Sequence, residues 1–130
     1  MAKVALIIVG VLVFIFISPF VYLGLKSSVR MRALQSRTDY PQIASACVTL
    51  ARSLTNHSLI KPSDPRVPPL LRSLSPQYIA ADSNSVRMEF HGGFDHYGYR
   101  VEQSDTNAKQ WTISWYTEKR KRLLGTISTE

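Results

Sequence analysis

The sequence is poor in cysteine and in acidic residues. Its single cysteine, Cys47, excludes an intramolecular disulfide, so the fold must be held by packing. Nine Asp and Glu stand against sixteen Lys and Arg, giving a formal net charge of +7. This balance suits an anionic partner, such as lipid headgroups or an acidic protein surface, and it also serves ordinary solubility.

Several catalytic signatures are also missing. The sequence has no Gly-x-Ser-x-Gly, no His-Glu-x-x-His, no phosphate-binding loop and no paired carboxylates. Cys47 and His96 are the residue types of a nucleophile and its base, but Cys47 falls inside an expected buried helix stripe. The sequence therefore leans against an enzyme, and it indicates no cofactor and no small-molecule substrate.

Residues 4–25 lack charge altogether and read VALIIVGVLVFIFISPFVYLGL. A helix of this length spans about 33 Å, close to the roughly 30 Å hydrocarbon core of a bilayer. The run is longer than the apolar core of a signal peptide, about 7–15 residues, and no Ala-x-Ala pattern follows it before the charges begin. We therefore expect residues 1–25 to be a retained transmembrane anchor, crossing the membrane once.

Residues 26–40 are expected to form a basic juxtamembrane stalk that continues the helix for a few turns. Its cations are candidate contacts for lipid headgroups: Lys26, Arg30, Arg32 and Arg37. Only Lys3 lies on the other side of the anchor, so the positive-inside rule slightly favours a cytoplasmic domain. Export to the periplasmic or extracellular side stays open, because long domains cross largely regardless of charge.

Residues 41–118 are expected to fold as a small α+β domain. Apolar residues between Ile43 and Leu54 recur at the spacing of one buried helical stripe, and Pro41 suits its first turn. Prolines crowd residues 61–76, which predicts a rigid connector. From residue 77 the period changes to two, in four runs separated by turn signals. The predicted fold is one amphipathic helix packed on a four-stranded antiparallel sheet.

Alternation within these runs separates an apolar sheet face from a polar one. The apolar positions are Val86, Met88, Phe90, Tyr97, Tyr99, Val101, Trp111, Ile113 and Trp115. Because the helix covers the apolar side, the polar face is a candidate interaction surface, with Arg87, Glu89 and Arg100. Residues 119–130 are expected to be a basic C-terminal tail. Its cations are further interaction candidates: Lys119, Arg120, Lys121 and Arg122.

The stretch HGGFDHYGYR, residues 91–100, predicts a hairpin whose glycines supply positive φ in a tight turn. The alternative is a metal site, because His91, Asp95 and His96 suit zinc or another divalent ion. Three ligands on a loop do not close a tetrahedral structural site, and no second cysteine is present. The turn is the preferred interpretation, and the metal site stays open as the alternative.

The sequence thus predicts a single-pass membrane-anchored accessory or interaction protein without catalytic activity, such as a small subunit of a membrane complex. Its expected partners are the lipid bilayer and other membrane-protein subunits. Nucleic acid binding is disfavoured, because most aromatic residues share the apolar face. The alternative function is a membrane-tethered metal- or ligand-binding domain, or an enzyme, that uses the hairpin of His91, Asp95 and His96.

Overall fold

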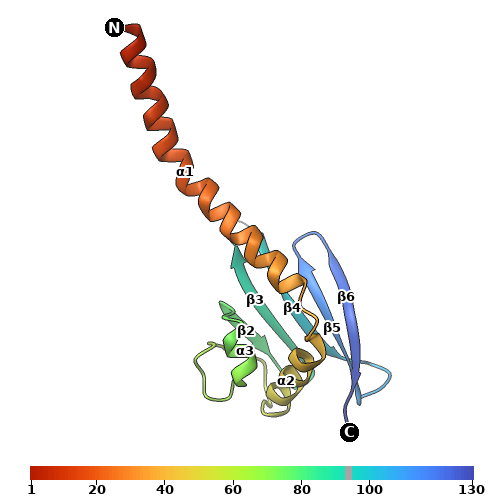
Figure 1. The fold of residues 1–130 in the computed structure, drawn as a ribbon. Coiled ribbons are helices and arrows are strands. Elements are labelled where there is room, and N and C mark those ends of the chain that lie inside the picture. The colour runs from red at the N-terminus through yellow and green to blue at the C-terminus, as the bar shows by residue number, and fades with distance from the viewer. Residues whose placement is uncertain (93–94) are drawn as a thin grey trace.

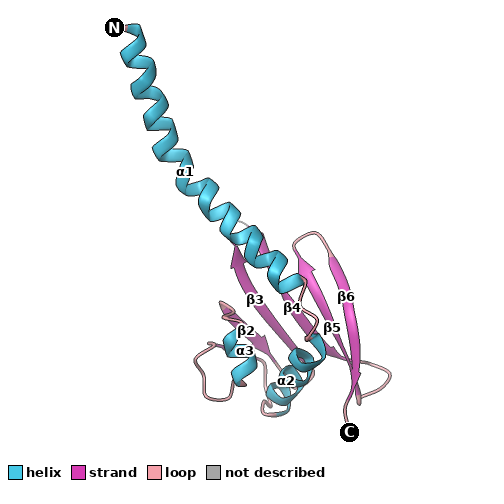
Figure 2. Cartoon of the chain, viewed as in Figure 1, coloured by secondary structure: helices cyan, strands magenta, loops and turns pink. Residues whose placement is uncertain are grey.

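The computed structural model describes residues 1–92 and 95–130 as a long helix that leads into a helix-covered sheet (Figure 1; Figure 2). The helices are α1 (Ala2–Gln35), α2 (Tyr40–Arg52) and α3 (Pro69–Ser73). The strands are β1 (Ser58–Ile60), β2 (Tyr78–Ala81), β3 (Ser85–Gly92), β4 (Asp95–Gln103), β5 (Gln110–Thr117) and β6 (Lys121–Ser128). Each strand pairs antiparallel with the next along the chain. The architecture is α+β, as predicted.

The sheet has six strands, so the prediction of four was wrong. The short strand β1 was missed before the proline-rich connector, and β6 occupies most of the segment expected to be a tail. The backbone N–H of Thr117 donates to the Arg120 carbonyl at 2.8 Å, which closes a tight turn between β5 and β6. Lys119 and Arg120 therefore lie in a hairpin turn, and Lys121 begins a strand.

The core lies between one face of the sheet and the helices. All the apolar positions predicted for this face on β3, β4 and β5 are buried. From α2, Ile43, Cys47 and Leu50 are fully buried, and this helix contacts β3, β4, β5 and β6. A group of aromatic rings completes the core, with centroids 5.1 to 6.2 Å apart: Phe90, Tyr97, Tyr99 and Trp115.

Helix α1 has two parts with different surroundings. Its apolar part stands clear of the domain with none of its most apolar stretch buried, and it is long enough to cross a membrane, a test that a signal sequence also passes (Figure 1). Its last turns lie on β3, where Leu34 is buried and its carbonyl accepts a hydrogen bond from the Tyr99 hydroxyl. The segment expected to be a stalk is therefore helical to Gln35 and packed on the sheet.

Arg30 ties α1 to two other parts of the domain. Its guanidinium carbon lies 5.5 Å from the centroid of the Phe90 ring, on β3. The same guanidinium donates to the carbonyls of Leu74 and Ser75, at 3.3 and 2.5 Å, just after α3. Ser75 has a φ of 53°, the left-handed region that non-glycine residues rarely adopt. Arg30 thus satisfies carbonyl groups at a strained turn.

Replacing Arg30 with alanine should lower the free energy of unfolding by about 1–2 kcal/mol, because a charged donor pair and a cation–π contact are lost. Arg32→Ala, two residues away on the exposed side of α1, is the control and should change it by less than about 0.5 kcal/mol. Chemical denaturation followed by the fluorescence of the buried Trp111 and Trp115 measures both. Equal effects would show that Arg30 does not hold the junction.

Candidate functional site: the open sheet face

The candidate site is the sheet face that points away from the helices, which we call the open face. Alternation along each strand sends every second side chain to this side, and none of the described helices covers it (Figure 2). The strand register places these residues on it: Tyr78, Arg87, Glu89, Arg100, Glu102, Ser114, Tyr116 and Lys121. The three sheet residues predicted as an interaction surface therefore share one face.

Two arginines lie at the centre of the open face. Arg87 and Arg100 are direct cross-strand neighbours on β3 and β4, and like charges in this arrangement destabilise a sheet unless other groups offset them. Arg100 forms an ion pair with Glu102 at 2.7 Å, and Lys121 reaches the other oxygen of that carboxylate at 2.8 Å. Three cations on this face, Arg87, Arg100 and Lys121, therefore outnumber its two carboxylates, Glu89 and Glu102, and the open face keeps a net positive charge.

Two shallow hollows flank the arginine pair. The larger, about 360 Å³, runs from Arg87 and Arg100 past Tyr116 to the turn between β5 and β6. The smaller, about 180 Å³, runs from the same arginines towards His57. The larger hollow is also lined by residues 119–121, so the structure joins two groups that the sequence treated separately, the sheet arginines and the cations of the expected tail.

Glu89 is the buried carboxylate of the open face, with a side chain only 7 % exposed. One oxygen accepts a hydrogen bond from the Tyr78 hydroxyl, and the other lies 2.5 Å from Nδ1 of His96. Burial raises the pKa of Glu89, but the Tyr78 and His96 hydrogen bonds and the nearby charge of Arg87 outweigh it, so the pKa falls below its ordinary value. Both oxygens are therefore committed to structural contacts.

This lowered pKa predicts an acid-sensitive domain. The ionised Glu89 contributes stability above its ordinary pKa of 4.5, and this contribution is lost as the pH falls through the lowered folded-state value. Glu89→Gln should reduce the free energy of unfolding by about 1–2 kcal/mol at neutral pH, with the gap to the native chain closing under acid. Denaturation between about pH 7 and pH 3 tests this. A gap independent of pH would contradict it.

Tyr116 and Gly98 fit together on the open face. Gly98 lies opposite both Glu89 and Tyr116, and a Cβ there would come 1.8 Å from the Met88 carbonyl oxygen and 3.0 Å from the Tyr116 hydroxyl. That hydroxyl donates to the same carbonyl at 3.4 Å. Because burial raises its pKa, the Tyr116 phenol stays protonated and serves as a donor.

The alternative metal site is only partly within view. The side chains of His91 and Asp95 lie outside the described part of the structure, as do residues 93 and 94 between β3 and β4. Register pairs Phe90 with Tyr97 and His91 with His96, so β3 and β4 form the predicted hairpin, while its turn at residues 93–94 lies outside the described residues. Nδ1 of His96 lies against Glu89. Among the described residues no group of three His, Cys, Asp or Glu is placed to hold a metal ion.

Cys47 lies on the opposite side of the sheet from the open face. Its side chain is 0 % exposed inside α2, and burial raises the pKa of its thiol. A thiol in this position neither reaches the open face nor ionises readily, which agrees with a packing role.

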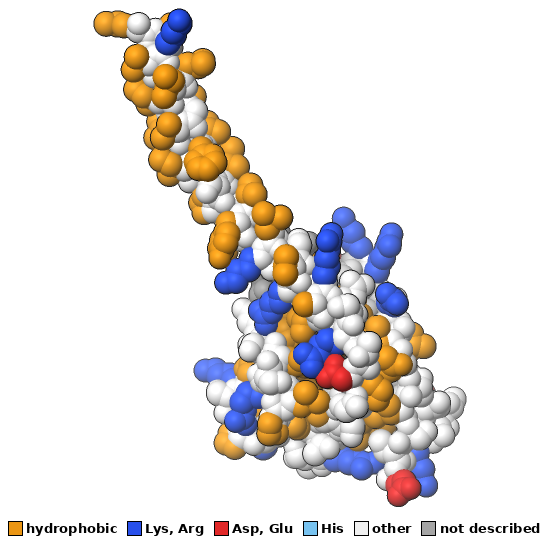
Figure 3. Space-filling model, viewed as in Figure 1, with side chains coloured by type: hydrophobic (Ala, Val, Ile, Leu, Met, Phe, Trp, Pro, Cys, Tyr) orange, Lys and Arg blue, Asp and Glu red, His pale blue; other side chains and the backbone are white. Residues whose placement is uncertain are grey.

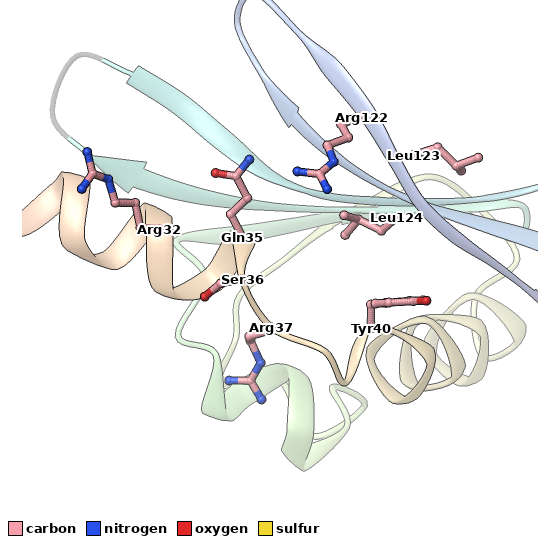
Figure 4. A pocket seen from close by; sticks show the side chains of 8 residues that line it. All are labelled: Arg32, Gln35, Ser36, Arg37, Tyr40, Arg122, Leu123 and Leu124. Atoms are coloured by element: carbon pink, nitrogen blue, oxygen red, sulfur yellow. The ribbon is translucent and has the colours of Figure 1, made fainter.

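A larger hollow, about 570 Å³, lies on the helix side of the sheet between the end of α1 and β6 (Figure 4). Its basic residues do not converge: Arg32 points away, and Arg37 turns to an ion pair with Asp39 at 2.6 Å. Tyr40 forms part of its wall, since a Cβ at Gly125 would meet the Tyr40 ring at 2.5 Å. The four residues predicted to contact lipid therefore fall into two groups. Arg30 and Arg37 are bonded within the domain, whereas Lys26 and Arg32 are exposed.

Tyr78 and Tyr116 were not singled out as site residues from the sequence. The alternation of polar and apolar residues placed Tyr116 on the polar face. Its hydrogen-bond acceptor, the Met88 carbonyl on β3, could not be predicted because it depends on how the strands pair. The chain matches no protein-family model, no curated protein and no solved structure.

Proposed function

We propose that the chain is a single-pass membrane protein whose domain is a non-catalytic docking module, an accessory subunit of a membrane complex. The observation that carries this proposal is the open face, a positively charged sheet surface that no described helix covers, on a sheet that the last turns of α1 contact. Arg87, Arg100 and Tyr116 supply its contacts, because Arg and Tyr are enriched among the residues that dominate binding at interfaces.

The anchor is supported by the surroundings of α1. None of its most apolar stretch is buried against the rest of the described chain, so a bilayer is the environment that would remove this surface from water. The exposed Lys26 and Arg32 lie within seven residues of Leu25, where the apolar part ends. The positive-inside rule therefore favours the domain on the cytoplasmic side.

The direction of the strands favours a partner beside the domain in the same membrane. β3, β4, β5 and β6 run roughly along the line on which α1 leaves the domain (Figure 1). The open face consequently looks sideways along the membrane, not into it. Strands of eight residues extend about 26 Å, so the face can contact a neighbouring subunit that extends a similar distance from the membrane.

The chemistry of the open face favours acidic groups on the partner. A guanidinium offers paired N–H donors that match a carboxylate, and Arg87 and Arg100 place two such groups side by side. A catalytic role finds less support, because the oxygens of Glu89 are already bonded and Cys47 is buried. We therefore propose an acidic protein surface as the ligand of the open face.

Purification of the tagged full chain from native membranes in mild detergent tests the proposal. The native chain should co-purify with a membrane-protein partner, and Arg87→Glu with Arg100→Glu should lose that partner while staying in the membrane. The matched control reverses two exposed lysines away from the face, Lys61→Glu with Lys109→Glu, and should keep the partner.

Three outcomes would contradict the proposed function. A native chain recovered alone, under conditions that preserve other membrane complexes, would remove the docking role. A partner retained by the arginine variant would move the interface elsewhere. Release of the native chain from membranes by alkaline carbonate would show that α1 is not an anchor.

A further inference from the structure

The end of the domain nearest the apolar part of α1 carries a cluster of basic side chains. The turn between β5 and β6 lies there, and residues 117–119 form a small hollow with Met31 of α1. Figure 3 shows Lys and Arg side chains gathered around this end, where α1 leaves the domain. We call this the basic end, and its exposed members are Lys26, Arg32, Lys119, Arg120 and Arg122.

The distance to the bilayer follows from the helix. Met31 lies six residues beyond Leu25, the last residue of the uncharged run, which places it about 9 Å further along the helix axis. The headgroup layer on each side of a bilayer is about 5–8 Å thick. The turn beside Met31 thus lies just beyond the outer edge of this layer, and the long side chains of Lys119 and Arg120 can bridge the remaining distance.

Other contacts leave these cations available. Arg30 and Arg37 are bonded within the domain, and Lys121 is paired with Glu102. Lys119 and Arg120 are exposed in the turn, with Glu118 as the only acidic residue between Thr117 and Arg122. A net positive turn held at the membrane surface attracts anionic lipid.

We propose that the basic end docks on anionic phospholipid headgroups, so that the domain is held upright against the bilayer by two contacts, α1 and the turn between β5 and β6. This inference rests on the proposed anchoring by α1. It goes beyond the docking function, because it fixes how the open face is presented to a partner.

The test uses the full chain reconstituted in lipid vesicles, with Glu118→Cys as a reporter in the turn. Cys47 is buried, so a neutral polyethylene-glycol maleimide reads only the new thiol. Labelling should be about five-fold slower in vesicles with roughly one third anionic lipid than in zwitterionic vesicles, and about 1 M salt should remove the difference. Thr49→Cys, on the exposed side of α2, should label equally in both.

Neutralising the turn with Lys119→Gln and Arg120→Gln should abolish the lipid dependence, whereas the matched change Lys61→Gln with Lys109→Gln should leave it intact. Equal labelling of Glu118→Cys in both lipids, in a chain that resists carbonate extraction, would overturn this inference and leave the anchor standing. A chain that carbonate releases from the vesicles would overturn the anchor and this inference together.

Discussion

Gly98→Ala should be the most damaging single substitution in the sheet, lowering the free energy of unfolding by about 3 kcal/mol or more. The added Cβ would lie 1.8 Å from the carbonyl oxygen of Met88, a backbone atom that cannot move without breaking the pairing of β3 and β4. For a domain of this size the loss corresponds to roughly 12 °C or more in Tm. Thermal unfolding followed by tryptophan fluorescence measures it.

Two other glycines provide graded controls for this substitution. Gly125→Ala meets the Tyr40 ring at 2.5 Å, a side chain that can turn aside, so about 1 kcal/mol is expected. Gly24→Ala meets nothing within 4 Å and should leave the domain unchanged. A Gly98→Ala protein as stable as the Gly24→Ala protein would mean that β4 does not approach β3 as described.

Leu50→Ala should produce the second large effect, a loss of about 3 kcal/mol, because it opens a cavity where α2 meets the sheet. Leu50 is fully buried in the same stripe as Cys47. The thiol therefore reports the opening of the core. When labelling follows the equilibrium population of the open state, a maleimide should label Cys47 in the Leu50→Ala protein on the order of 100-fold faster than in the native chain.

Thr49→Ala is the control, since Thr49 lies beside Leu50 in sequence but on the exposed side of α2. Thr49→Ala should change the free energy of unfolding by less than about 0.5 kcal/mol and should leave the rate of Cys47 labelling unchanged. Rapid labelling of Cys47 in the native chain, before any substitution, would contradict its burial.

The core could be predicted from the sequence because its periodicity is regular. Residues 86–90 alternate without interruption, so the buried sheet face was identified correctly. The stripe around Cys47 keeps the helical spacing over three turns and identified most of the buried helix face, but it omitted the buried Ala44 and Val48. The strand β6 was missed because a bulge interrupts its alternation: Ile113 pairs with Gly125, but Ser114 pairs with Leu123. The run of four cations, two in the turn before β6 and two at its start, also resembles a solvated tail. The strand β1, with three residues, is too short for a period to show.

The candidate site was predictable only in part for a related reason. The period of two put Arg87, Glu89 and Arg100 on one face, which needs no knowledge of strand pairing. Lys119 and Lys121 lie next to that face only because β5 and β6 form a hairpin. Glu89 is buried beside Tyr78 only because β2 pairs with β3. Contacts between strands are set by register, which the sequence of a single strand does not contain.

The docking role of the open face is tested most directly by photocrosslinking in native membranes. A photoreactive residue is placed at Thr112 or Thr126 on the open face, or at Ser45 or Thr49 on the exposed side of α2. We expect one partner to be crosslinked from both open-face positions and from neither α2 position, and the crosslink to be lost when Arg87 and Arg100 are replaced by glutamate. Crosslinks from α2 alone, or from none of the four positions in a membrane-embedded chain, would contradict it.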